Sequence, residues 1–326
     1  MNSTIRHKAL ILNKTLKAAV IGVGYLGRFH AQKYAGLPDV DLIAVADPNP
    51  EQAARVADEC GTRALTDFRE LLDTVDLVSV VVPTQLHHAV ARECLAHDIH
   101  VLLEKPMTVT LAEADELIEL AKQRSRVLQV GHLERFNAAV LALEGVLTTP
   151  RFIESHRLAP FNPRGADVNV VLDLMIHDID IIQMLVHSPI ENIDANGVPV
   201  LTDEVDIVNT RIRFANGCVA NVTASRVSMK PQRKIRIFQN DAYITVDFNN
   251  RVLDVHRKGD REVFPGIPEI NSQERQFKSG DAIRDEIVAF VDAIRRGVAP
   301  PVTGEDGRLA LETSIRISDL LAKQAH

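Results

Sequence analysis

The chain has 326 residues, enough for two domains, and its 46% hydrophobic and 25% charged residues are typical of a water-soluble α/β protein. A formal net charge of −7 disfavours DNA or RNA as the main partner, because nucleic acids bind basic surfaces. No apolar run reaches the ~20 residues of a membrane span, and the N-terminal ALIL run is too short for a secretory signal, so we expect a cytoplasmic protein without a membrane partner.

The first part of the chain predicts a doubly wound parallel sheet. Short Val- and Ile-rich runs without polar alternation, separated by helical segments, are typical of a parallel sheet covered on both faces. We therefore predict a dinucleotide-binding Rossmann domain over residues 16–135. The predicted strands are Leu16–Ile21, Asp41–Ala46, Leu77–Val82, His100–Leu103 and Val127–Val130, and the predicted helices include Phe29–Tyr34, Pro50–Glu59, His87–Ala96 and Leu111–Gln123.

The sequence GVGYLG follows the first predicted strand and opens a helix. Its first glycine permits a tight turn, its second lets a pyrophosphate approach the backbone, and its third lets helix and strand pack closely. The helix N-terminus attracts the phosphate charge. The motif predicts a cofactor site, and the alternative is a glycine-rich turn without a ligand. The expected contacts are Gly22, Gly24, Tyr25, Leu26 and Gly27.

Asp47 ends the second predicted strand, where a carboxylate can accept hydrogen bonds from a ribose hydroxyl. Because this charge would repel a 2′-phosphate, we expect NAD rather than NADP. The alternative is an Asp that only caps the following helix, before Pro48.

Two further strand ends face the same edge, since ligands of open α/β sheets bind beyond the carboxyl ends of strands. Pro83, Thr84 and His87 follow one strand and are candidate cofactor contacts, although His87 suits the surface of a helix equally well. Glu104 and Lys105 follow the next strand and are also expected at the cofactor. Lys105 is a candidate catalytic residue that donates to a substrate hydroxyl or relays its proton. The alternative for this pair is a surface salt bridge.

The character of the chain changes after about Pro150. Apolar residues alternate with polar ones between Glu204 and Arg257, and the Asn216-Gly217 pair is a hairpin signature, which together predict an antiparallel meander with one buried face. Residues 136–326 are therefore predicted to form an α+β domain, to which the resemblance described below assigns substrate binding and oligomerisation. It ends in helices around Ile283–Ile294 and over Gly304–Lys323, which can pack back on the Rossmann domain.

A helix over Val171–Ile182 is apolar except for four polar residues. Asp173, His177 and Asp180 stand at i, i+4 and i+7, which places them on one face of an α-helix. A His near carboxylates suits general acid–base work on a hydroxyl, so His177 and Asp173 are catalytic candidates. The alternative is a structural hydrogen-bond network. We expect no metal, because no Cys or His cluster has ligand spacing.

Four more residues are candidates for substrate binding. His132 and Arg135 follow the last predicted parallel strand, and Arg157 and Arg164 could offer guanidinium groups to a ligand phosphate. For each arginine the alternative is a solvated or ion-paired side chain. The three cysteines, Cys60, Cys94 and Cys218, form no pair and no zinc spacing, which indicates reduced thiols.

Taken in order, these motifs resemble the Gfo/Idh/MocA family, the relatives of glucose–fructose oxidoreductase and inositol dehydrogenase. The matching elements are GVGYLG, Asp47, the VVPT segment with His87, EKP, and the DxxxH of Asp173 and His177. The resemblance implies a nicotinamide cleft between the two domains and a large, mostly antiparallel open sheet that forms homodimers or homotetramers. It also implies that His177 is the general base, that Lys105 polarises the hydroxyl or relays its proton, and that Asp173 orients His177 or the substrate.

Within that family, GHLERFN and DLMIHDIDII are most similar to UDP-N-acetylglucosamine 3-dehydrogenases. Those sequences usually carry Pro after the Asn, whereas this chain has Ala138. The resemblance implies NAD-dependent oxidation of the 3-OH of UDP-N-acetylglucosamine or of a related sugar nucleotide. The alternatives are a dehydrogenase of a free polyol such as inositol and a non-catalytic regulator that senses dinucleotide.

Overall fold

The structure is a computed structural model that describes residues 15–162, 169–278 and 280–324. The chain divides into two compact units. Unit 1 comprises the chain up to Leu133 together with Asp281–Arg308, and unit 2 comprises Glu134–Gly280 together with the chain from Leu309. The first break lies close to the predicted boundary, but a later segment returns to unit 1.

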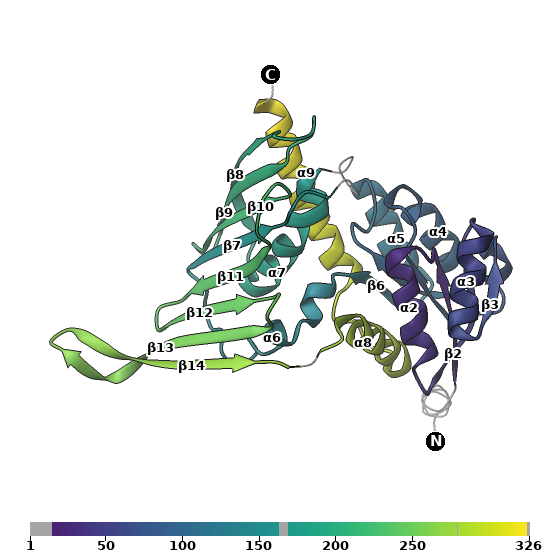
Figure 1. Cartoon of the computed structure of the whole chain (residues 1–326), viewed down its shortest axis with the longest axis horizontal. Coiled ribbons are helices and arrows are strands. Elements are labelled where there is room, and N and C mark those ends of the chain that lie inside the picture. Colours follow the sequence, from purple (N-terminus) through teal and green to yellow (C-terminus); the bar gives the residue numbers. More distant parts are fainter. Residues whose placement is uncertain (1–14, 163–168, 279, 325–326) are drawn as a thin grey trace. The chain divides into compact units, whose positions relative to one another are not determined.

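Unit 1 is built on a six-stranded parallel sheet of order β3-β2-β1-β4-β5-β6 (Figure 1). This order is that of the doubly wound Rossmann fold, which confirms the predicted fold class. In spatial order the strands are β3 (Arg63–Leu65), β2 (Val40–Ala46), β1 (Leu16–Ile21), β4 (Leu77–Val80), β5 (His100–Glu104) and β6 (Leu128–Gly131), and the helices are α2 (Tyr25–Ala35), α3 (Pro50–Cys60), α4 (Thr84–Ala96), α5 (Leu111–Gln123) and α8 (Ala282–Arg296).

Two helices of unit 1, α3 and α5, begin at residues whose side chains cap them. Asn49 caps α3 by accepting the backbone N–H groups of Glu51 and Gln52, and Thr110 forms a capping box with Glu113 at the start of α5. The late helix α8 lies beside α2, where it adds Ile287, Phe290 and Ile294 to the core. The expected return of a late helix to the Rossmann unit therefore applies to α8.

Unit 2 contains an eight-stranded sheet in which β10 and β7 are parallel and the other neighbours are antiparallel (Figure 1). In spatial order its strands are β14 (Ile267–Gln276), β13 (Val252–Phe264), β12 (Ala242–Asp247), β11 (Gln232–Phe238), β7 (Phe152–Leu158), β10 (Val219–Ser225), β9 (Ile207–Phe214) and β8 (Ile190–Val198). One face carries the core, which also takes apolar residues from α6 (Ala138–Leu141), α7 (Ile176–Val186) and the later part of α9 (Gly304–Gln324).

Successive side chains of β7 lie on opposite faces of this sheet and differ in burial. Ile153, Ser155 and Arg157 are buried toward the helices, whereas Phe152 and the other intervening residues are half-buried on the opposite face. The predicted turn at Asn216-Gly217 joins β9 to β10, and Gly217 has a φ of 81°, which favours glycine. Strands β7, β8 and β14 were not among the predicted strands.

Among the described residues, no helix is both long enough and apolar enough to cross a lipid bilayer.

Candidate active site

The glycine-rich turn between β1 and α2 has the backbone that its sequence requires. Gly22 has a φ of 84°, and a Cβ at Gly27 would lie 1.9 Å from the carbonyl oxygen of Gly22. A Cβ at Gly24, in contrast, would meet no protein atom within 4 Å. The first and third glycines are thus needed by the fold, while the second leaves open space in front of a helix whose first turn has no acidic residue and no capping side chain. This arrangement fits a dinucleotide pyrophosphate.

Asp47 follows β2 and holds this turn in place. Its Oδ2 accepts the backbone N–H of Val23 at 2.9 Å, and its Oδ1 accepts that of Asn49 at 2.9 Å. The capping role belongs to Asn49 rather than to Asp47, so the helix-capping alternative is wrong. The carboxylate stands beside the glycine-rich turn, where the ribose-binding role was expected.

The residues after β4 differ in their exposure. Pro83 is exposed and Thr84 half-buried, and Tyr25 and Leu26 of the glycine-rich turn are likewise exposed and half-buried. His87 is buried, and its ring nitrogens lie 2.8 Å from the carbonyl oxygen of Pro106 and 2.9 Å from that of Val82. Burial lowers the pKa of His87, against the opposite effect of these two carbonyls. His87 therefore ties the segment after β4 to the segment after β5, and it is not the helix-surface residue of the alternative.

Glu104 and Lys105 stand at the carboxyl end of β5, and the peptide bond between Lys105 and Pro106 is cis. Lys105 is half-buried, and its backbone N–H donates to Glu104 Oε2 at 3.3 Å. Glu104 is only 8% exposed, and its Oε1 lies 3.3 Å from His30 Nε2. Its side chain points into unit 1, so the alternative of a surface salt bridge is wrong for Glu104. Gly131 makes this possible, since a Cβ there would lie 2.9 Å from the carboxylate.

In unit 2 the four ionisable residues of the 171–186 segment divide into two pairs. Asp178 and Asp180 are each 1% exposed and bind arginines. Asp178 accepts from Arg157 Nε and from Ser155 Oγ, while Asp180 accepts two hydrogen bonds from Arg135, at 2.8 and 2.6 Å. For Asp178 and Asp180 these are structural interactions of the kind that the hydrogen-bond alternative described.

Asp173 and His177 remain half-buried. The expected single stripe with Asp180 is wrong because Val171–Met175 forms a π-helical turn before α7 begins at Ile176. A π-turn contains more residues than an α-turn, so positions before and after it do not keep the α-helical spacing. π-turns recur at functional sites.

The predicted substrate-binding arginines are committed to carboxylates. Arg157 is 2% exposed, with Nη1 2.8 Å from Glu134 Oε1, and although burial opposes its charge, Asp178 and Glu134 raise the pKa of Arg157. Arg135 is 9% exposed and bound to Asp180. Both match the ion-paired alternative rather than an open phosphate site. His132 is buried in unit 1 at 1% exposure, and Arg164 lies outside the described residues.

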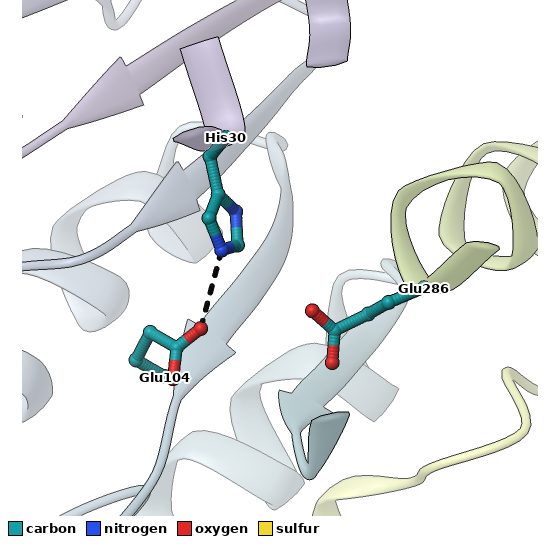
Figure 2. A group of neighbouring side chains, drawn as sticks. All are labelled: His30, Glu104 and Glu286. Atoms are coloured by element: carbon teal, nitrogen blue, oxygen red, sulfur yellow. Dashed lines mark ion pairs between the residues drawn. The ribbon is translucent and has the colours of Figure 1, made fainter. Parts of the chain in front are cut away.

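Two residues near Glu104 were missed from the sequence. His30 on α2 and Glu286 on α8 are buried with it, and the potential ligand atoms of the three lie within 4.8 Å of one another (Figure 2). The sequence did contain a signal for Glu286: this acidic residue lies within the apolar stripe of its helix, which indicates a buried carboxyl group.

Comparison with known proteins matches both units. Residues 16–132 fit a family model described as "Oxidoreductase family, NAD-binding Rossmann fold", and residues 139–245 fit one described as "GFO/IDH/MocA C-terminal domain". UDP-N-acetylglucosamine 3-dehydrogenase of Acidithiobacillus ferrooxidans is 41% identical over 93% of this chain and 96% of its own. Myo-inositol 2-dehydrogenase of Thermotoga maritima is 26% identical over 91% of this chain and 93% of its own.

Solved structures agree in fold. The Acidithiobacillus ferrooxidans UDP-N-acetylglucosamine 3-dehydrogenase superposes with a TM-score of 0.89 at 40% identity, covering 94% of this chain and 97% of that one. A levoglucosan dehydrogenase solved with NADH superposes with a TM-score of 0.83 at 22% identity, covering 94% of this chain and 97% of that one. At 22% identity this likeness concerns the fold alone.

Proposed function

Because this chain belongs to the Gfo/Idh/MocA family of oxidoreductases, we propose that it oxidises a ring hydroxyl of a nucleotide-linked sugar, with NAD as hydride acceptor. The proposed substrate is UDP-N-acetylglucosamine and the proposed reacting group its 3-OH. The relative that is 41% identical over 93% of the chain carries this proposal. The difference at Ala138 does not weaken it. Ala138 is the first residue of α6, a position where Pro is tolerated because the N–H there has no partner within the helix.

NAD supplies, when bound, the nicotinamide ring that accepts the hydride. The glycine-rich turn and the start of α2 would hold its pyrophosphate, and Asp47 its adenosine ribose. We favour NAD over NADP because the Asp47 carboxylate beside that turn would repel a 2′-phosphate.

We propose that Lys105, Asp173 and His177 serve the same reacting hydroxyl. Lys105 donates a hydrogen bond to the oxygen and stabilises the charge that develops on it, His177 takes the proton, and Asp173 orients His177. The division of the 171–186 segment supports the last two roles, since Asp178 and Asp180 are occupied by arginines and Asp173 and His177 are half-buried.

The substrate test offers NAD with UDP-N-acetylglucosamine, UDP-glucose and myo-inositol and follows NADH absorbance. UDP-N-acetylglucosamine deuterated at C3 is expected to react with a primary isotope effect and to give deuterated NADH. Deuterium retained in the sugar would move the reaction to another carbon. A preference for myo-inositol would reassign the substrate, and NAD binding without turnover of any of the three would favour the regulator.

The mechanistic test compares Lys105→Ala, His177→Ala and the double variant. Each single variant is expected to lower kcat by about 10²–10⁴-fold while leaving the Kd for NAD nearly unchanged. Groups that act on one hydroxyl lose their effect together, so the double variant should be far less impaired than the product of the single losses. Multiplicative losses would assign the two residues to separate steps, and unchanged turnover would remove either one from the mechanism.

We also propose that the protein is a homo-oligomer assembled through the open face of the unit 2 sheet. The rings of four residues form a ladder across four strands, with neighbouring ring centroids 5.0–5.8 Å apart: Phe152, Phe238, Tyr243 and His256. The β13–β14 hairpin exposes Phe264 and Ile270, each 68% exposed. Exposed apolar groups of this kind mark contact surfaces. Sedimentation of a Tyr243→Asp variant tests the assignment, because a charge on this face should dissociate the oligomer.

We also propose a cytoplasmic location, because the three free cysteines fit a reducing compartment.

A further inference from the structure

Three ionisable side chains meet inside unit 1 (Figure 2). His30 comes from α2, Glu104 from the end of β5 and Glu286 from α8, and they are 1%, 8% and 0% exposed. Figure 2 shows the carboxyl group of Glu286 directed toward the other two side chains. One member of the cluster, Glu104, directly precedes Lys105 in the chain, although nothing in the proposed mechanism uses the cluster.

Two of the three side chains have partners. His30 Nε2 lies 3.3 Å from Glu104 Oε1, and its Nδ1 lies 3.1 Å from Ser79 Oγ, which is 3.0 Å from the hydroxyl of Tyr34. Glu104 Oε2 accepts the backbone N–H of Lys105. Among the described residues, neither carboxyl oxygen of Glu286 has a hydrogen-bond partner.

A buried carboxylate without a donor is strongly unfavourable, and a second carboxylate close by makes it more so. The groups that face Glu286 do not offset this charge: Glu104 on β5 is itself an acid, and Tyr34 on α2 is neutral because burial raises its pKa. His30 on α2 is directed to Glu104. Burial, and then Glu104, raise the pKa of Glu286 well above its usual range. A proton on Glu286 removes the repulsion and creates an O–H donor toward Glu104.

We propose that Glu286 is a protonated carboxylic acid in the working enzyme and a positioning residue for Lys105, acting through Glu104. The neutral acid places no like charge beside Glu104, so that Glu104 Oε2 stays in place as acceptor for the Lys105 N–H. Ionisation of Glu286 would set two like charges against each other in a buried site and displace this acceptor. The inference rests on the proposed role of Lys105, but its first two tests need no substrate.

The first test measures unfolding by urea from pH 5 to pH 9 for the wild type and Glu286→Gln, a neutral side chain of similar shape. An acid whose pKa is raised by folding binds its proton more tightly in the folded state. Above about pH 5 the wild type therefore loses stability relative to Glu286→Gln, by about tenfold in the unfolding constant per pH unit, until the folded-state pKa is reached. Asp292→Asn, at an exposed position of the same helix, is the control and should show no such trend.

The second test is infrared spectroscopy at pH 7. The carbonyl stretch of a protonated carboxylic acid is expected in the wild type and in Asp292→Asn and should be missing in Glu286→Gln. The proposal that Glu286 is protonated would be overturned if this band is missing and the stability of the wild type and of Glu286→Gln changes equally with pH. It would also be overturned by a stoichiometric divalent metal ion that is bound by the wild type and lost in Glu286→Gln, because a cation would then compensate the charge.

The third test addresses positioning. Glu286→Gln should keep kcat near the wild-type value and abolish the decline in kcat that the wild type shows once Glu286 ionises at high pH. Glu286→Ala should lower kcat about tenfold or more, with little change in the Kd for NAD. If the first two tests succeed and Glu286→Ala keeps the wild-type kcat and pH profile, Glu286 is protonated but does not position Lys105. A protein inactive on every sugar offered fails the proposed function while leaving the protonation results standing.

Discussion

Asp47 and Val23 are joined by a hydrogen bond of 2.9 Å that links the end of β2 to the glycine-rich turn after β1. The carboxylate thereby has two tasks, since it fixes the shape of the turn and presents negative charge beside it. Substitutions that separate the two tasks distinguish the structural contribution of Asp47 from its contribution to cofactor choice.

We expect Asp47→Asn to shift the preference from NAD toward NADP. The amide keeps an oxygen that can accept the Val23 N–H, but it loses the charge that repels a 2′-phosphate. The ratio of kcat/KM for NAD to that for NADP should fall by about tenfold or more, because one charge interaction of ~1.4 kcal/mol corresponds to tenfold. Asp47→Ala also loses the acceptor and should weaken both cofactors. An unaltered ratio in Asp47→Asn would place cofactor selection elsewhere.

Gly24→Ala and Gly27→Ala should separate cofactor binding from folding. A Cβ at Gly24 meets no protein atom, so the melting temperature should change less than in Gly27→Ala, while the methyl group obstructs the pyrophosphate and raises the Kd for NAD. A Cβ at Gly27 collides with the Gly22 carbonyl, so this variant should be less stable and bind poorly. NADH fluorescence titration and thermal unfolding measure the two effects. Tight NAD binding by Gly24→Ala would contradict the assignment of this turn.

The fold of the Rossmann unit can be predicted from the sequence because the local sequence signals there agree with the tertiary structure. Continuous apolar strands, the GVGYLG turn and Asp47 all follow from short-range rules. The same rules did not predict the pairing of Arg135 with Asp180. This pairing depends on a contact between residues that lie 45 positions apart in the chain. The rules also failed at Asp173, where a π-turn breaks the α-helical spacing, and at Glu286, whose acidic side chain lies among apolar core positions.

The buried pair of Arg135 and Asp180 should contribute strongly to the stability of unit 2. Arg135→Ala leaves a carboxylate buried without its partner and should lower the free energy of unfolding by about 3–5 kcal/mol. Arg236→Ala is the matched control, because its 2.6 Å pair with Glu154 is 41% and 28% exposed and should be worth below ~1 kcal/mol. Urea unfolding followed by circular dichroism measures both. Equal losses would contradict the importance of burial.

His100 should make the protein less stable in acid. The backbone N–H of Val127 donates to His100 Nδ1 at 2.9 Å, which requires that nitrogen to be unprotonated, and burial, followed by Arg126, lowers the pKa of His100 to about 4. The unfolded chain binds the proton first, so this contribution is complete above pH 6.5 and is lost as the pH falls toward 4. The loss should not exceed about 1.4 kcal/mol per pH unit.

Urea unfolding between pH 7 and pH 4 tests this expectation, with His100→Asn retaining an acceptor that does not titrate. The variant should lose less stability than the wild type over this range. His97→Asn, at an exposed position directly after α4, serves as the control. Curves that stay parallel for the wild type and His100→Asn would show that His100 does not titrate differently on folding.

The return of α8 to unit 1 has a consequence for biosynthesis. Ile287, Phe290, Ile294 and Glu286 complete the interior of a domain whose sheet ends at Gly131. A nascent chain that has emerged only as far as Leu133 carries every strand of that sheet but leaves the surface that α8 covers open to water. The nucleotide-binding domain can therefore mature only after the whole sheet of the other domain has been translated, which exposes an apolar surface to chaperones while residues 134–281 are being made.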